Sequence, residues 1–249
     1  MKNFHFASNR WQNASRSVTI PAVARPYVQY CPVAHSLELV GERWALLIVR
    51  DLLKGPKRYS DLLGGLPGLG TNILAARLRD LERGGVVHKR KLPPPANCNV
   101  YELTEYGAQL EEVIHALGRW GFRSLGPPPA KGCELPEGWL VQGAEVMFDP
   151  ERAGDLTASW VVRCAGEVAT IRVANGSIEA DPGAESEVDA VLELDLGTLF
   201  GLVAGELDPD DAIAHGLVQV EGDPAALVSF LSIFDAERVP EETAAAAAA

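Results

Sequence analysis

The stretch that decides the fold of the first half runs from Thr71 to Arg83 and reads TNILAARLRDLER. Its leucines recur at helical spacing and share one face, while an amide, small methyl groups and guanidinium groups occupy the opposite face. Thr71 is the expected N-cap, and the glycine pair at 84–85 is expected to end the helix. The pattern predicts an amphipathic helix with one buried side and one side open to a partner.

Three shorter helices are predicted before this segment, over residues 32–40, 42–53 and 59–63. Apolar side chains recur at helical spacing in the first two, and Gly55-Pro56 ends the second. Ser60 is the expected cap of the third. Together with residues 71–83, these segments predict a bundle of short helices joined by tight turns.

Two β-rich runs follow, VVHKRK at residues 86–91 and NVYEL at residues 99–103, and prolines stand between them. They predict a hairpin, or wing, with a basic first strand. Thr104 is then the expected cap of a last helix that carries a continuous apolar stripe. The resulting order of helices, turn, helix and basic hairpin is typical of a winged helix-turn-helix DNA-binding domain.

The outer face of the helix at 71–83 suits base recognition in a major groove. Asn72 can read adenine, Arg79 can read guanine or contact phosphate, and the alanine methyl groups can meet thymine. Arg77 lies on the flank, where it braces the helix or reaches the DNA backbone. The basic hairpin and the pair at 57–58 suit phosphate contact. The predicted DNA-contacting residues are Lys57, Arg58, Thr71, Asn72, Ala75, Ala76, Arg77, Arg79, Lys89, Arg90 and Lys91. The alternative is a small α+β domain whose basic residues form a solvated surface.

The net charge of -12 hides an asymmetry along the chain. Residues 25–125 carry 14 basic and 10 acidic side chains, whereas residues 126–249 carry 5 basic and 24 acidic ones. The acidic half is a poor surface for nucleic acid, but the mildly basic half is not. Halves of opposite sign therefore predict two domains with different partners.

Composition restricts the class of protein. Apolar residues make up 47% of the chain, enough for a buried core, and no apolar run has the length of a membrane helix or of a signal sequence. The four cysteines form no CxxC pair, which argues against a zinc site or a secreted disulfide framework and favours a reducing cytoplasm.

The expected segments are an extension at 1–24, a winged-helix and dimerisation domain at 25–125, a Pro/Gly linker at 126–136, a second domain at 137–240 and a tail at 241–249.

The second half shows a different pattern. Strands are predicted over residues 157–164, 167–173, 177–179, 190–194 and 217–222. Helices are predicted over residues 196–204, from 208 onward and over 224–234. Asn175-Gly176 is a turn signal between two of the strands. This mixture predicts an α+β domain.

Several blocks of the first half resemble the HxlR-type winged-helix regulators over about residues 30–121. They are CPV at 31–33, GERWALLI at 41–48, RYSDL at 58–62, LRDLE at 78–82 and YELTEYG at 101–107. The resemblance implies a bacterial homodimer built from the first and last helices, with two recognition helices in successive major grooves. The chain departs from the family at Ala75 and Ala76, where members often carry polar side chains.

Cys31 falls at a position where some HxlR-type members carry a redox-sensing thiol, so a redox-responsive regulator is one alternative. The other is a reduced, partly buried cysteine, because no neighbouring base in the sequence would activate the thiol.

The second half, over about residues 156–234, resembles the sterol-carrier-protein type of lipid-binding fold, most specifically at residues 199–222. The resemblance implies a curved sheet with helices on one face and an apolar tunnel that holds a fatty or isoprenoid ligand. The candidate tunnel residues are Trp160, Leu199, Phe200, Val203, Phe230 and Phe234. Each of them is equally compatible with a plain core position.

The sequence thus predicts a cytoplasmic, DNA-binding transcriptional regulator that acts as a homodimer on double-stranded DNA and senses an apolar small molecule. A lipid carrier with a vestigial winged helix is the alternative. No enzyme activity, cofactor, metal or membrane contact is expected. The second half holds one histidine, His215, and no GxSxG motif, and Asp208, Asp210 and Asp211 do not have the spacing of a calcium loop.

Overall fold

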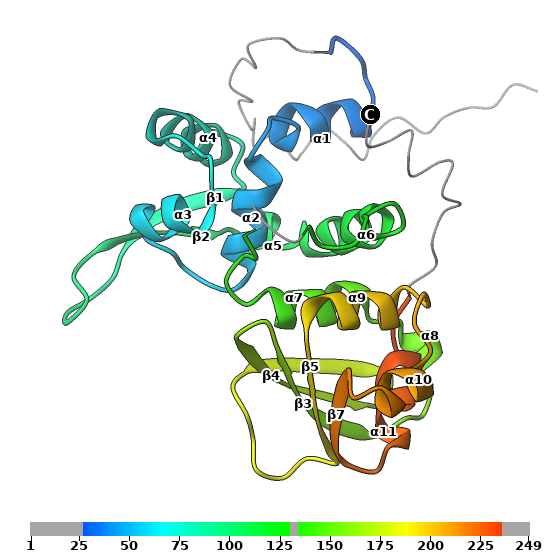
Figure 1. Ribbon diagram of the computed structural model, residues 1–249. Coiled ribbons are helices and arrows are strands. Elements are labelled where there is room, and N and C mark those ends of the chain that lie inside the picture. Colours follow the sequence, from blue (N-terminus) through cyan, green and yellow to red (C-terminus); the bar gives the residue numbers. More distant parts are fainter. Residues whose placement is uncertain (1–26, 130–133, 236–249) are drawn as a thin grey trace, which may run out of the picture.

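The structure, a computed structural model, describes residues 27–129 and 134–235 (Figure 1). We call residues 27–125 the front part and residues 134–235 the back part. The expected extension at 1–24 and the tail at 241–249 lie outside the described residues, as does a section of the expected linker at 126–136.

The front part contains a compact set of helices and one hairpin in the predicted order. The elements are α1 (Pro32–Val40), α2 (Ala45–Leu53), α3 (Tyr59–Gly65), α4 (Thr71–Arg83), β1 (Val87–Lys91), β2 (Asn99–Leu103), α5 (Glu105–Ala108) and α6 (Glu111–Phe122). The predicted bounds of α1, α4 and β2 are confirmed. Strands β1 and β2 pair antiparallel, and the hairpin projects from the helices (Figure 1).

The leucine face of α4 forms the centre of the front core. Leu74, Leu78 and Leu81 are buried, and they belong to one apolar cluster with Ile48 and Leu52 of α2. This packing fixes the opposite face of α4 toward solvent, as the spacing predicts.

One predicted helix start and two predicted helix caps are wrong. Helix α2 begins at Ala45 and not at residue 42, because Trp44 has a left-handed φ of 80° that interrupts the helix. The N-cap of α4 is Gly70, so Thr71 is already the first helical residue and caps nothing. Ser60 lies inside α3, whose first turn is closed by the Asp61 carboxylate, which accepts from the Arg58 backbone N–H at 3.0 Å.

Thr104 is confirmed as a cap, but of a shorter helix than predicted. Its hydroxyl oxygen accepts from the Gly107 N–H at 2.9 Å at the start of α5. This helix ends at Ala108, and a separate helix, α6, begins at Glu111. A side chain at position 107 would lie about 2.0 Å from the carbonyl oxygen of Val86, so only glycine lets α5 approach the hairpin this closely.

The back part is a five-stranded sheet with helices. The elements are α7 (Trp139–Met147), α8 (Pro150–Ala153), β3 (Ala158–Cys164), β4 (Glu167–Ala174), β5 (Ser177–Pro182), β6 (Ala190–Leu194), α9 (Leu196–Val203), α10 (Pro209–Ala214), β7 (Val218–Gly222) and α11 (Ala225–Ser232). The strand order is β5-β4-β3-β6-β7, and only β3 and β6 pair in parallel. Helices α7 and α8 were not predicted.

The two faces of this sheet differ in chemistry. Trp160, Ile171 and Leu192 point to one face and are buried in a cluster with residues of α7, α9 and α11. On the other face, Arg172 contacts three acidic side chains, among them Glu185 at 2.7 Å. The helices therefore cover one face of the sheet, which confirms a mixed α+β architecture.

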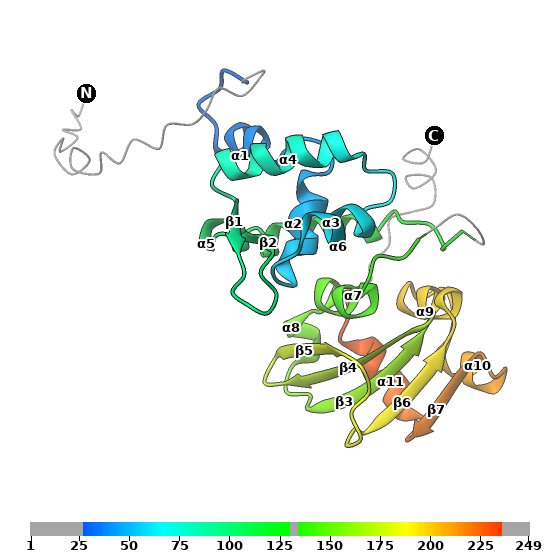
Figure 2. The ribbon, with the colours of Figure 1, turned by 90° about the vertical axis from the view of Figure 1, so that its left-hand side faces the viewer.

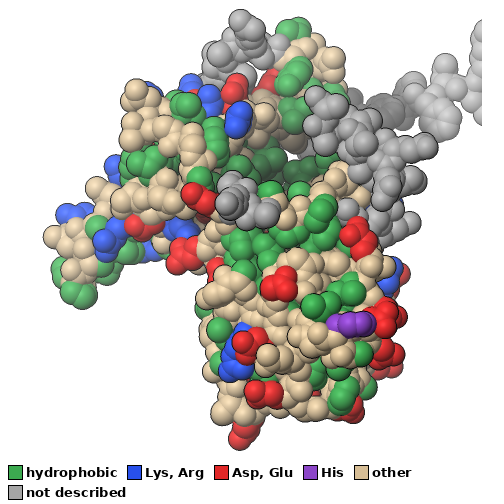
Figure 3. All heavy atoms as spheres, in the orientation of Figure 1, with side chains coloured by type: hydrophobic (Ala, Val, Ile, Leu, Met, Phe, Trp, Pro, Cys, Tyr) green, Lys and Arg blue, Asp and Glu red, His purple; other side chains and the backbone are tan. Residues whose placement is uncertain are grey.

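The two parts meet through helices. Helix α6 lies across α7 and α9, and the sheet lies beyond them (Figures 1 and 2). Lys and Arg side chains gather on the front part toward the hairpin, while Asp and Glu predominate on the visible face of the back part (Figure 3). None of the helices within residues 27–129 and 134–235 combines the length and apolar character needed to cross a bilayer.

Candidate nucleic-acid interface and ligand cavity

The solvent-facing side of α4 carries the predicted base-reading residues. Thr71, Asn72 and Arg79 are exposed, whereas Ala75 and Ala76 are half-buried. The backbone carbonyl of Thr71 accepts from the Tyr59 hydroxyl at 2.6 Å, which anchors the first turn of α4 to α3. The exposed set therefore sits on a helix held at both its leucine face and its N-terminus.

The arginines of α4 have different partners. Arg77 is half-buried and contacts Asp80 at 2.8 Å and Glu42 at 3.4 Å, so it braces α4 against the segment before α2. The guanidinium of Arg83 also pairs with Asp80. Within the described part of the chain, Arg79 donates only to the Ala75 carbonyl of its own helix, at 3.1 Å. Of these three, Arg79 has the guanidinium best placed to leave its intrahelical contact for DNA.

The hairpin carries a charge cluster of its own. Arg90 donates from Nε to Glu102 at 2.8 Å and from Nη2 to the second carboxylate oxygen at 2.5 Å. His88 lies 2.7 Å from the same carboxylate. The hydrogen bond from Arg90 lowers the pKa of Glu102. Lys89 lies over the Tyr101 ring at 5.7 Å, and Lys91 is exposed at the strand end. Lys89 and Lys91 are therefore freer than Arg90 to contact a DNA phosphate.

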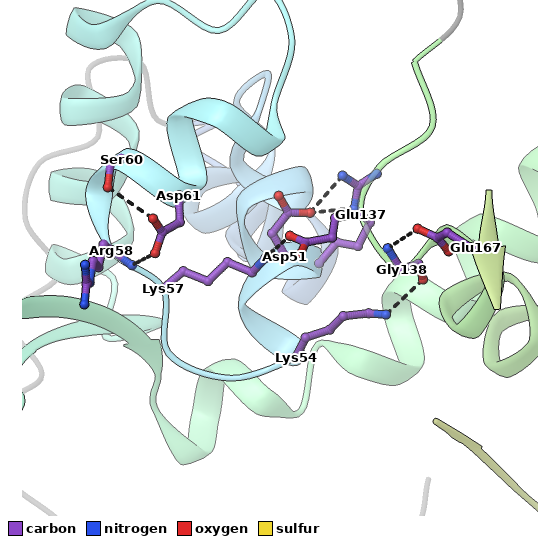
Figure 4. A network of polar contacts seen from close by, with 10 residues as sticks. Asp51, Lys54, Lys57, Arg58, Ser60, Asp61, Glu137, Gly138 and Glu167 are labelled. Carbon is purple, nitrogen blue, oxygen red and sulfur yellow. Dashed lines mark hydrogen bonds and ion pairs between the residues drawn. The ribbon is translucent and has the colours of Figure 1, made fainter. Parts of the chain in front are cut away.

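Of the basic pair before α3, Lys57 extends toward the back part, whereas Arg58 points away from it (Figure 4). Arg58 is exposed, but the ammonium of Lys57 lies 3.8 Å from the carboxylate of Glu137. Lys57 also exchanges two backbone hydrogen bonds with Tyr101 of β2, at 3.0 and 2.8 Å. Lys57 therefore links the hairpin, the start of α3 and the back part.

A second contact between the parts surrounds the start of α7 (Figure 4). Lys54 donates to the Gly138 carbonyl at 3.0 Å, and Glu167 of β4 accepts from the N–H groups of Gly138 and Leu140 at 2.6 and 3.1 Å. Desolvation at this contact lowers the pKa of Lys54. Desolvation also raises the pKa of Glu145, farther along α7. The network holds the first turn of α7 both to the front part, through Lys54, and to the sheet of the back part, through Glu167.

Helices α6 and α7 pack closely. A Cβ atom added at Gly118 would lie 2.4 Å from Cγ1 of Val146, and Arg119 donates to the Val146 carbonyl at 3.1 Å. Desolvation lowers the pKa of His115, one turn before Gly118. A glycine at this crossing therefore sets the spacing of the two helices.

An apolar cavity of about 460 Å³ lies where α6, α7, α9 and α11 meet. Phe122 at the end of α6 forms one wall together with residues 125–129, and its ring lies 5.6 Å from the ring of Phe200 in α9. The last helix of the front part is thus part of the wall of a cavity that otherwise belongs to the back part.

The structure divides the candidate tunnel residues into two groups. Those that line the cavity are Leu199, Phe200, Val203, Phe230 and Phe234. Trp160 lies outside the lining and is 0% exposed; its indole N–H donates to the Ala226 carbonyl at 3.1 Å. Sequence reasoning missed Phe122 and Trp139, which also line the cavity. The only signal for Phe122 was its place directly after the apolar stripe of the last front helix.

None of the described cysteines lines the cavity. Cys31 is half-buried at the N-cap of α1, and Cys98 is half-buried in the hairpin loop. Cys164 is buried on the inner face of the sheet, where desolvation raises its thiol pKa to about 12. Within the described ranges, no group of three or more His, Cys, Asp or Glu side chains is arranged to hold a metal ion.

Helices α1 and α6 share an unusual exposure of large apolar side chains. Val33 of α1 is 67% exposed and Trp120 of α6 is 71% exposed. Leu37, Val113 and Leu117 of the same two helices are also exposed. No residue of α6 is buried within the single chain. These faces leave apolar area in water that a second molecule can cover.

Comparisons with known proteins separate the two parts. Residues 39–127 match the HxlR-like helix-turn-helix family, and residues 140–239 match the alkyl sulfatase C-terminal family. An uncharacterised HTH-type transcriptional regulator, sll1512 of Synechocystis, is 35% identical over 91 residues, which cover 36% of this chain and 67% of that protein. The HTH-type transcriptional regulator YodB of Bacillus subtilis is 35% identical over 98 residues, 39% of this chain and 88% of that protein. The solved reduced form of YodB is 33% identical, covers 38% of this chain and 94% of that chain, and superimposes with a TM-score of 0.35.

Proposed function

This chain belongs to the HxlR-like helix-turn-helix family and is a DNA-binding transcriptional regulator, and we propose that it binds its operator as a homodimer whose DNA affinity depends on an apolar ligand held by the back part. The observation that carries the ligand proposal is the apolar cavity in which Phe122 of α6 meets Phe200 of α9. We treat residues 25–125 and 137–240 as two domains joined by residues 126–136.

Operator contact is assigned to α4 and the hairpin. Asn72 and Arg79 read bases from the exposed face of α4, with Thr71 and the methyl groups of Ala75 and Ala76 beside them. The ion pairs of Arg77 support a bracing role. Phosphate contact is assigned to the basic residues at the rim of this surface. They are Lys57, Arg58, Lys89, Arg90 and Lys91.

The homodimer is supported by the apolar faces of α1 and α6. Burying side chains as exposed as Val33 and Trp120 removes apolar area from water, at roughly 25 cal/mol per Å². A twofold pairing of these helices also presents two copies of α4 to one duplex. Because α6 lies in the dimer contact and in the cavity wall, any shift of α6 would change the relation of the two α4 helices.

The back part is assigned a sterol-carrier-like role in ligand binding. Its helices on one face of a five-stranded sheet and its apolar cavity support that assignment. The match to the alkyl sulfatase C-terminal family covers the same residues, and we assign them binding without catalysis. Incubation with dodecyl sulfate tests this: we expect no release of sulfate above that from heat-denatured protein, and time-dependent release would contradict it.

The ligand can change DNA affinity only if it binds the arrangement of the dimer that fits DNA more tightly, or less tightly, than the arrangement that does not. Couplings of this kind are typically about 1–3 kcal/mol, or roughly 5- to 150-fold in operator affinity. The alternative is that a ligand merely stabilises the fold.

The test compares operator affinity and melting temperature in the same samples. The fluorescent apolar probe N-phenyl-1-naphthylamine serves as the ligand, and DNA from upstream of the chain's own gene serves as the operator. We expect the probe to raise the melting temperature and to change operator affinity. Phe200→Ala, in the cavity wall, should reduce both effects, whereas Val228→Ala, an exposed residue of α11 outside the lining, should leave both intact. A raised melting temperature with unchanged operator affinity would contradict the regulatory role.

A further inference from the structure

The wall of the apolar cavity includes a tryptophan, Trp139, whose indole N–H is a hydrogen-bond donor that the proposed function does not use. Trp139 is the first residue of α7 and forms part of the cavity wall. Its Nε1 atom is buried and has no hydrogen-bond partner within residues 27–129 and 134–235. A buried donor without a partner is costly, and such groups are rare in folded proteins.

The other buried indole of the back part shows the contrast. Trp160 donates to the Ala226 carbonyl at 3.1 Å, although it lies at the centre of an apolar core. The fold therefore supplies a backbone acceptor to the indole that serves only packing. Trp139, in the wall of a cavity, has no such acceptor in the described chain, and a molecule that fills the cavity lies against its ring and can supply one.

The rest of the lining restricts the chemistry of that molecule. Every described side chain around the cavity is apolar, or the residue is glycine, and no charged side chain is among them. A carboxylate or phosphate placed there would lose its hydration without gaining a cation, which is strongly unfavourable. The volume of about 460 Å³ lies within the range of small-molecule sites.

We infer that the cavity takes a neutral, largely apolar small molecule with a carbonyl-type oxygen, as in a ketone or an ester, that accepts a hydrogen bond from the Trp139 indole N–H. This inference rests on the proposed function only in placing a ligand in the cavity; it does not depend on any effect on DNA. Trp139 is then the residue that separates carbonyl compounds from hydrocarbons of the same length.

Three ten-carbon compounds test the inference on the full chain: 2-decanone, decane and decanoate. Each competes with N-phenyl-1-naphthylamine, and the indole N–H resonances are followed by NMR. We expect 2-decanone to bind more tightly than decane and decanoate. The Trp139→Phe variant, which keeps an aromatic ring and removes the donor, should weaken 2-decanone about 3- to 10-fold and leave decane unchanged.

The spectra identify the contact directly. The Trp139 resonance is the one that Trp139→Phe removes, and it should shift with 2-decanone but not with decane. Trp44→Phe, in the front part and outside the lining, is the matched control and should leave all three affinities unchanged. Equal affinities for 2-decanone and decane, unaffected by Trp139→Phe, would overturn the inference and leave an apolar ligand site standing. Preference for decanoate would overturn the neutral class. Failure of the probe and of every compound to bind would instead contradict the proposed function.

Discussion

Replacing Gly118 with alanine tests whether α6 rests on α7 in solution. A Cβ atom at this position meets Cγ1 of Val146 at 2.4 Å, a distance that real Cβ contacts essentially never show. Gly121, one turn later in the same helix, has open space around its Cβ position within the chain. The two glycines therefore form a matched pair, in which only the first carries the contact between the parts.

The expected magnitudes follow from two opposing effects. Alanine in place of a helical glycine stabilises by up to about 1 kcal/mol. Forcing extra volume into a packed contact destabilises by about 1–3 kcal/mol. Gly121→Ala should therefore be neutral or stabilising, and Gly118→Ala should be less stable than Gly121→Ala by about 1–3 kcal/mol. Truncating the neighbour with Val146→Ala should remove that difference, so the double-mutant cycle should show a coupling of similar size.

The assay is urea unfolding, with free energies compared only among variants that share the same m-value. The same proteins are then titrated with operator DNA, with and without N-phenyl-1-naphthylamine. We expect Gly118→Ala to weaken the effect of the probe on DNA affinity and Val146→Ala to restore it in the double variant. If Gly118→Ala behaves like Gly121→Ala in both assays, α6 and α7 are not packed as described, and the route from cavity to operator is refuted.

Three further predictions concern the DNA face, the dimer and the core. Arg79→Ala should weaken specific operator binding by about 1–3 kcal/mol in a gel-shift assay, with less effect on random duplex; equal loss on both would mean that Arg79 contacts phosphate alone. Trp120→Glu should shift the chain from dimer to monomer in sedimentation and weaken operator binding, whereas Val228→Glu, also exposed, should do neither; a dimer that survives Trp120→Glu would contradict the assigned interface. Cys164, whose thiol pKa is raised to about 12, should resist iodoacetamide near pH 8 until urea unfolds the protein, as mass spectrometry of the labelled peptide will show; labelling of the folded protein would contradict its burial.

Local signals explain which parts of the fold were predictable. The leucine period of α4 and the glycines that follow it lie within one short segment, so both bounds of that helix were predicted correctly. The start of α2 was not, because the left-handed conformation of Trp44, with Arg43 over its ring at 5.1 Å, has no signature in the sequence. The whole of α7 was missed because its apolar side chains pack against α6 and the sheet, and these contacts cannot be seen in the local sequence.

The candidate site residues, too, were predictable where the signal is local and were missed where it depends on distant parts of the chain. The spacing of Asn72 and Arg79 on α4 places both on the exposed face without knowledge of the rest of the fold. The ion pairs of Arg90 and Lys57 depend on partners far along the chain, and sequence spacing does not reveal them. The cavity shows the same limit, since Phe122 joins it only because α6 crosses the back part.

The central claim is that occupancy of the cavity changes DNA binding through α6. The most direct test is the operator dissociation constant of the wild-type chain at zero and at saturating N-phenyl-1-naphthylamine, at one fixed salt concentration because phosphate contacts make the affinity salt-dependent. We predict a change of at least about fivefold that disappears in Phe200→Ala. An identical dissociation constant in both conditions, with the probe shown to be bound, would contradict the account.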